Sequence, residues 1–202
     1  MKSFLFLFFT FNFFNAQQSY EFNKEIIYNI KFNEKNNESI IYINVNDDSY
    51  FLKTYKNSDN SYAIIYDLKN NKKNYYEMIE IPNSNKYDLK FEKSERFYPD
   101  KLMNYNHYDY VTSSIENTEE LRIYFNKKRK KTYKIFKFET TESEIDYFPA
   151  YKFSCLHPFE FNQNLKYDKP LLVKKSIILY KENTCECNLK TTNDVIFTLK
   201  NK

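Results

Sequence analysis

The chain has 202 residues, a formal net charge of +4 and no glycine. A P-loop, a dinucleotide-binding G-x-G-x-x-G loop and a G-x-S-x-G nucleophile elbow each need glycine, so the composition excludes these sites in their standard form. The small charge excess is spread over many acidic and basic residues and gives no reason to expect nucleic acid as a partner. Without glycine, turns that require a positive φ are expected to use Asn or Asp.

Residues 1–16 have the features of a secretory signal peptide: Lys2, an apolar run over residues 4–14, and Asn15-Ala16 before a polar segment. A membrane-spanning helix needs about 20 apolar residues, so this run is too short for one, and no transmembrane helix is expected. Cleavage after Ala16 leaves residues 17–202 as one domain. The protein is therefore expected to be secreted or periplasmic.

Apolar and polar residues alternate with period two along most of the remaining chain, which predicts β-strands. A strand is expected at residues 26–32, and residues 39–81 are expected to form four more. Later strands are predicted at residues 87–91, 121–125, 133–138, 171–180 and 195–199.

Residues 94–118 carry the weakest pattern and predict a long connection with one short strand near residues 108–111. A helix at residues 117–121 or within residues 20–30 stays open. The sequence therefore predicts an all-β protein with a single antiparallel domain of about ten strands, either a sandwich or a partly open barrel.

Two short motifs, Cys155-Leu156-His157 and Cys185-Glu186-Cys187, hold all the cysteines. In an oxidising compartment we expect a disulfide from Cys155 to Cys185 or Cys187, with the third thiol left over. Three reduced, buried thiols are one alternative. A metal site made of Cys155, His157, Cys185 and Cys187 is another, since residues i and i+2 of an extended segment share a face. A Cys155–His157 catalytic pair lacks an orienting group in the sequence.

A basic run, Lys127, Lys128, Arg129, Lys130 and Lys131, falls between two predicted strands. Like charges separate best in water, so the run is expected at an exposed hairpin tip. Contact with an anionic envelope polymer, a lipid head group or nucleic acid is the functional alternative.

No motif predicts a catalytic residue, a cofactor or a His-rich metal site. We therefore expect an exported, non-enzymatic β protein that binds an apolar or amphipathic ligand, or an envelope component, in the concavity of a curved sheet. One alternative is a secreted enzyme with a site near Cys155 and His157, and another is a surface protein that acts through the basic hairpin. A pocket lined by Tyr and Phe without clustered titratable groups favours the first interpretation, convergent His157, Cys155 and carboxylates in a cleft favour the enzyme, and a flat basic face favours the surface protein.

Overall fold

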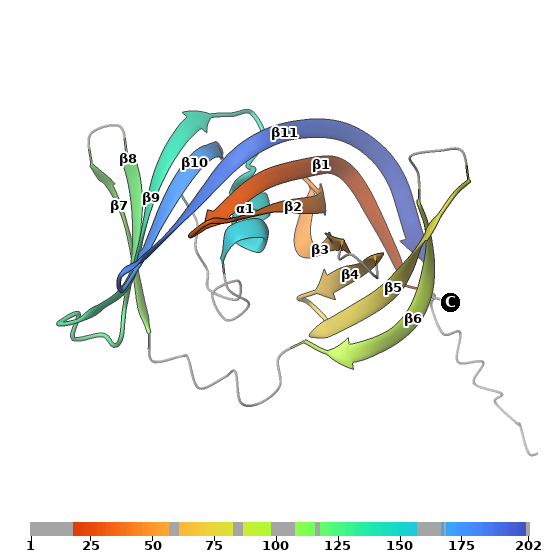
Figure 1. Ribbon diagram of the computed structural model, residues 1–202, viewed down its shortest axis with the longest axis horizontal. Helices are drawn as coiled ribbons and strands as arrows, with labels where there is room; N and C mark the ends of the chain where they lie inside the picture. Colours follow the sequence, from red (N-terminus) through yellow and green to blue (C-terminus); the bar gives the residue numbers. More distant parts are fainter. Residues whose placement is uncertain are drawn as a thin grey trace, which may run out of the picture.

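The computed structural model describes residues 18–56, 61–82, 87–97, 108–115, 118–156, 167 and 169–200. In this part of the chain, eleven strands form one sheet and a single helix accompanies them (Figure 1). The strands are β1 (Ser19–Phe32), β2 (Lys35–Asn44), β3 (Asp47–Lys56), β4 (Ser61–Asp67), β5 (Lys72–Glu80), β6 (Tyr87–Arg96), β7 (Asp109–Ile115), β8 (Thr118–Tyr124), β9 (Thr132–Glu142), β10 (Leu171–Tyr180) and β11 (Asn183–Lys200). The helix is α1 (Phe148–Cys155). The predicted signal peptide lies outside the described residues.

The strand order is β6-β5-β4-β3-β2-β1-β11-β10-β9-β8-β7, and the described neighbours pair antiparallel. The first and last strands meet in the middle, while β6 and β7 form the two edges. The sheet bends strongly around α1, and its edges stay apart (Figure 1). The prediction of an all-β antiparallel fold is confirmed, and of the two expected architectures the single curved sheet corresponds to the partly open barrel.

Most strands lie where alternation predicts them: β2 to β5 are the four expected between residues 39 and 81, and β10 covers residues 171–180. The two helices left open are wrong. Residues 20–30 belong to β1, which pairs with β2 on one side and β11 on the other, and β8 begins at Thr118. Strand β11 is much longer than predicted, because two register shifts against β1 interrupt its alternation.

The helix α1 is a feature that the sequence analysis did not predict. It has eight residues and is buried on almost every side, including Phe148, Ala150, Tyr151 and Phe153, so it shows no polar face that would give a helical period. Its start carries two recognisable signals. A proline occupies the first turn, and the Asp146 carboxylate accepts a hydrogen bond from the Phe148 amide at 3.0 Å.

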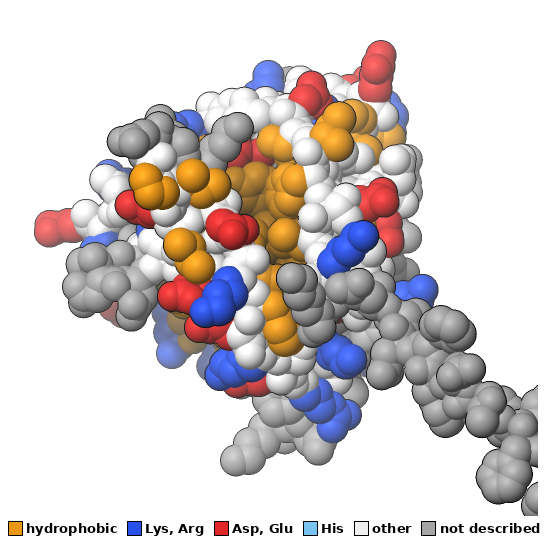
Figure 2. Space-filling view, turned by 90° about the vertical axis from the view of Figure 1, so that its right-hand side faces the viewer, with side chains coloured by type: hydrophobic (Ala, Val, Ile, Leu, Met, Phe, Trp, Pro, Cys, Tyr) orange, Lys and Arg blue, Asp and Glu red, His pale blue; other side chains and the backbone are white. Residues whose placement is uncertain are grey.

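Two apolar cores lie on opposite faces of the sheet. The larger contains α1 and the concave face, with residues such as Ile26, Phe51 and Phe138. The smaller packs the ends of β1 and β11 against the other face of β3 to β5. Strand β4 separates the two cores, since Ile64 belongs to the larger and Ile65 to the smaller. On the side of the molecule that carries β5, β6 and the end of β11, Figure 2 shows a hollow with a band of hydrophobic side chains and charged residues on both sides.

Four described residues have a positive φ, and only two of them are the Asn or Asp that the sequence analysis expects. Asn33 and Asn71 are of the expected type, but Arg129 (φ 54°) and Lys181 (φ 53°) are not. Both lie between paired strands, β8 with β9 and β10 with β11, so the hairpin imposes the left-handed conformation although a Cβ makes it unfavourable.

Candidate functional site

The helix α1 is fixed against the concave face by polar and aromatic contacts along its length. The Tyr151 hydroxyl donates to the Ser176 Oγ of β10 at 2.8 Å. The Phe153 ring stacks on Phe51 of β3 with centroids 4.0 Å apart. At its C-terminal end the Ser154 carbonyl accepts a hydrogen bond from the Lys53 ammonium at 3.2 Å. These contacts to separate strands hold α1 in one place, and its last turn forms one wall of a pocket.

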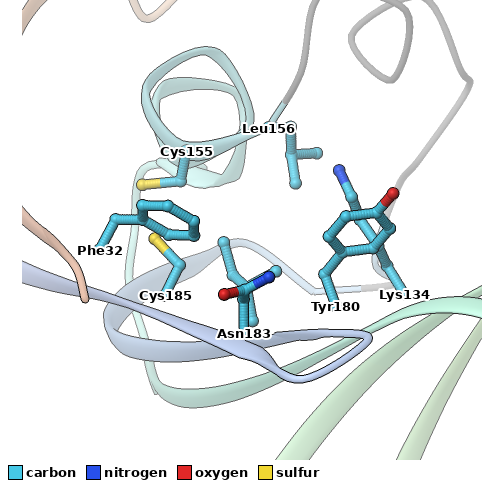
Figure 3. A pocket seen from close by; sticks show the side chains of 8 residues that line it. Phe32, Lys134, Cys155, Leu156, Tyr180, Asn183 and Cys185 are labelled. Carbon is cyan, nitrogen blue, oxygen red and sulfur yellow. The ribbon is translucent and has the colours of Figure 1, made fainter.

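This pocket has a volume of about 260 Å³ and lies between the end of α1 and the strands β1, β9, β10 and β11. Figure 3 shows Phe32 with the sulfurs of Cys155 and Cys185 on one side, and Leu156, Tyr180 and Lys134 on the other. The lining residues are Phe32, Lys134, Cys155, Leu156, Ile178, Tyr180, Asn183 and Cys185. Five different elements or their ends therefore build one site.

The lining is mainly apolar and aromatic. Phe32 keeps 44% of its surface exposed, which is unusual for a large apolar side chain in a domain that buries most of its others. Ile178 and Leu156 are buried at 7% and 5% exposure. Among the described residues that line the pocket there is no Asp or Glu. The lining therefore combines an apolar surface with the titratable side chains of Lys134, Tyr180 and two cysteines.

Lys134 supplies the charge in this lining. Its ammonium lies 5.3 Å from the Tyr133 ring centroid, 5.9 Å from that of Phe136 and 5.7 Å from that of Tyr180. Aromatic faces attract a cation electrostatically, so these rings help to hold the ammonium at the pocket wall. It is also close enough to the Cys185 thiol to act on its ionisation.

The three cysteines come together on the concave side, although Cys155 is 30 positions from Cys185 in the sequence. All three are free, and the Cys187 thiol interacts with those of Cys155 and Cys185. The hydrogen bond with Cys187, together with burial, raises the pKa of Cys185. The hydrogen bond with Cys155, together with burial, raises the pKa of Cys187. At neutral pH these two groups are therefore thiols rather than thiolate nucleophiles.

The other predicted sites are placed only in part. His157 lies outside the described residues, so the metal set of Cys155, His157, Cys185 and Cys187 and the Cys155–His157 pair stay predictions. Among the described residues, no three His, Cys, Asp or Glu side chains form a group that could hold a metal ion. The expected disulfide stays a prediction.

The basic run at residues 127–131 lies in the connection between β8 and β9, and all five side chains are exposed. Arg129 pairs with Asp109 at the start of β7. None of the five lines the pocket. Their functional role stays a prediction.

Sequence reasoning missed Lys134, Phe32 and Tyr180 as site residues. One signal was present for Lys134: it shares the period-two face of Phe136 and Phe138, so alternation places a lysine on the buried side of β9. A lysine at such a position needs a polar partner, a ligand or a route to water.

Comparisons with known proteins assign neither family nor function. No family model matches the chain, and no curated protein matches it. One solved structure that it resembles is a DUF1329 family protein from Desulfovibrio piger, with 8% identity, a TM-score of 0.25, and coverage of 89% of this chain and 87% of that one. Within the described residues, no helix has the length and apolarity to cross a membrane.

Proposed function

We propose that this is an exported, non-enzymatic protein that binds a small apolar or amphipathic molecule in the pocket beside α1. The observation that carries the proposal is the lining: aromatic and aliphatic side chains with one ammonium and one amide, and no carboxylate among the described members. Small-molecule sites are commonly concave and mostly apolar, with a few polar groups that orient the ligand. The partly exposed Phe32 gains buried surface when such a ligand binds.

The enzyme interpretation receives less support from the same pocket. General acid–base chemistry needs a titratable group near its working pH, and nucleophilic thiol chemistry needs a thiolate. The pKa of Cys185 is raised, so this lining thiol stays protonated. The Cys155–His157 catalytic pair stays a prediction, because His157 lies outside the described residues.

A fluorescent probe that is uncharged and apolar, N-phenyl-1-naphthylamine, tests the proposal by its increase in emission on binding. The decisive variants are Ile178→Phe and Asn183→Phe, which place a ring in the pocket from β10 and from the start of β11. The matched control is Ile177→Phe, since Ile177 is the neighbour of Ile178 on the same strand and is not among the lining residues.

We expect saturable binding to the wild-type protein and to Ile177→Phe, with at least about a tenfold loss in both pocket variants. Ile178 is buried, so its variant carries a risk of overpacking, whereas Asn183 is only half-buried and its variant should fold. Equal binding by all four proteins would place the probe elsewhere and overturn the proposal. Absence of binding to the wild-type protein would do the same.

A further inference from the structure

The proposed function leaves the chemical class of the ligand open, and the inference here rests on that function. We propose that the ligand is a small aromatic compound whose ring packs against Phe32 in the pocket beside α1. This class includes substituted phenols and excludes purely aliphatic chains.

Phe32 is the one phenylalanine in the described part of the chain whose ring contacts no other aromatic ring. It also keeps 44% of its surface exposed. Each of the other described phenylalanines has at least one ring partner: Phe22, Phe51, Phe91, Phe97, Phe125, Phe136, Phe138, Phe148, Phe153 and Phe197. Aromatic pairs stabilise beyond the area that they bury. A ring of the ligand would therefore give Phe32 the contact that the fold gives to the other phenylalanines.

The groups around Phe32 also suit a ring. The sulfurs of Cys155 and Cys185 lie beside Phe32, and the ring of Tyr180 lies on the opposite side of the pocket (Figure 3). Sulfur is polarizable and makes favourable contacts with aromatic rings, often at the ring edge. A bound ring therefore has aromatic and sulfur atoms around it. A flexible alkyl chain would gain only from burial and would lose conformational freedom on binding.

Asn183 gives the pocket an uncharged hydrogen-bonding group. Its side chain projects from the start of β11 and lies between Cys185 and Tyr180 in Figure 3. An amide both donates and accepts hydrogen bonds, so it can bind a hydroxyl or an N–H group on the ligand. A ring that carries one such substituent therefore complements the pocket better than a ring without polar atoms.

The volume of the pocket fits one substituted ring. A protein cavity of roughly 150 Å³ binds benzene, and this pocket has about 260 Å³. The additional volume leaves room for a substituent of a few atoms. A probe with these features is 4-ethylphenol, which combines one ring, a short alkyl group and one hydroxyl. Its matched compound is 4-ethylcyclohexanol, which has the same carbon and oxygen skeleton without the aromatic ring.

Calorimetric titration with both compounds tests the inference at neutral pH, where a phenolic hydroxyl is uncharged. The decisive variant is Phe32→Leu, which removes the ring and keeps an apolar side chain at a partly exposed position. The matched control is Phe91→Leu, because this residue lies on β6 and does not line the pocket. Phe32→Tyr provides a variant that keeps the ring.

We expect the wild-type protein to bind 4-ethylphenol about fivefold more tightly than 4-ethylcyclohexanol, or ~1 kcal/mol. Phe32→Leu should remove this preference by weakening the binding of 4-ethylphenol. Phe91→Leu and Phe32→Tyr should keep the preference.

If both compounds bind with equal affinity, or if Phe32→Leu keeps the preference, the inference is overturned and the proposed function stands. If neither compound binds to the wild-type protein and the uncharged fluorescent probe does not bind either, the proposed function falls and the inference falls with it. Loss of the preference in Phe91→Leu to the same extent as in Phe32→Leu would also overturn the inference, since a general change in the fold would then explain the effect.

A second measurement decides the question should Phe32→Leu fail to fold. Nuclear Overhauser contacts between the ring protons of 4-ethylphenol and those of Phe32 in the wild-type protein would support the inference. Contacts of the bound ring with other residues alone would overturn it.

Discussion

Oxidation of the cysteines should stabilise the protein, because a disulfide from Cys155 to Cys187 would join α1 covalently to β11. The bond would enclose residues 155–187, which is 187 − 155 + 1 = 33 residues. In the chain-entropy model a loop of this size stabilises by about 3.7 kcal/mol. For a protein of this length each kcal/mol raises the melting temperature by about 2–4 °C, so the expected gain is roughly 7–15 °C. All three thiols are free in the structure, so any rearrangement needed to form the bond subtracts from this gain.

The assay treats the protein with oxidised glutathione, counts thiols under denaturing, non-reducing conditions, and compares thermal melting with and without reductant. We expect one free thiol per chain, two more after reduction, and a melting temperature that falls when reductant is added. Cys155→Ala should abolish this sensitivity. Comparing Cys185→Ala with Cys187→Ala shows which of the two is the partner. Three free thiols after oxidation, or a disulfide with no gain in melting temperature, would refute the reasoning.

Three further predictions concern stability and one concerns export. Tyr20→Phe removes a buried hydroxyl that donates to Asp67 at 2.8 Å and accepts from Asn74 at 2.9 Å, so urea unfolding should show a loss of about 1–3 kcal/mol; no measurable loss would contradict this. Replacing residues 127–131 by Ser or Gln should leave the melting temperature nearly unchanged, because substitution of an exposed side chain usually changes the unfolding free energy by less than about 0.5 kcal/mol. Failure of this variant to fold would contradict the exposed placement of the basic run. Lys181→Asn should raise the unfolding free energy by up to about 1 kcal/mol, because Lys181 has a φ of 53° that Asn adopts at lower cost. A lower melting temperature of this variant would disprove the prediction. N-terminal sequencing of the protein recovered outside the cytoplasm should show a chain that begins near Gln17. An intact Met1 would rule out cleavage.

The sequence predicts those strands in which a single face is buried without interruption. In β2, Ser39, Ile41 and Ile43 are buried and alternate with less buried neighbours, and the alternation predicts this strand. Strand β11 fails this test because its register shifts twice against β1, so the pattern loses phase in the middle of a strand that continues. The helix α1 fails for a different reason, since it is buried on nearly all sides and amphipathic spacing is absent.

The site is harder to predict than the fold, because it depends on curvature. Lys134 and Cys185 are 51 positions apart, and Phe32 lies at the end of the first strand. The pairing of β1 with β11 and the bend of the sheet bring these residues to one pocket. No short sequence motif predicts that bend. The three cysteines can be recognised as a group from the sequence because their residue type is rare. The metal and catalytic alternatives for them depend on His157, which lies outside the described part.

Lys53 gives a pH-dependent test of how α1 is held in place. Its ammonium is partly buried on β3, where it donates to the Ser154 carbonyl. Burial lowers the pKa of Lys53, and the nearby Cys155 and Cys187 only partly oppose that shift. The unfolded chain therefore holds this proton to higher pH than the folded protein. Between the two pKa values the unfolded state binds more protons, so Lys53 makes stability rise with pH up to its ordinary value near 10.

Lys53→Met removes the buried charge and keeps a side chain of similar length. We expect the variant to be more stable than the wild-type protein at neutral pH, because it avoids the cost of burying an ammonium, and the difference to shrink as the pH rises toward 10. Tyrosines of the unfolded chain also ionise near pH 10, whereas burial in the folded protein raises the pKa of Tyr76 to about 12. Their contribution is common to both proteins and cancels in the difference between the two urea-unfolding profiles. A difference that stays constant with pH would show that the Lys53 ammonium reaches water, and that its hydrogen bond to Ser154, rather than its burial, determines its effect on the fold.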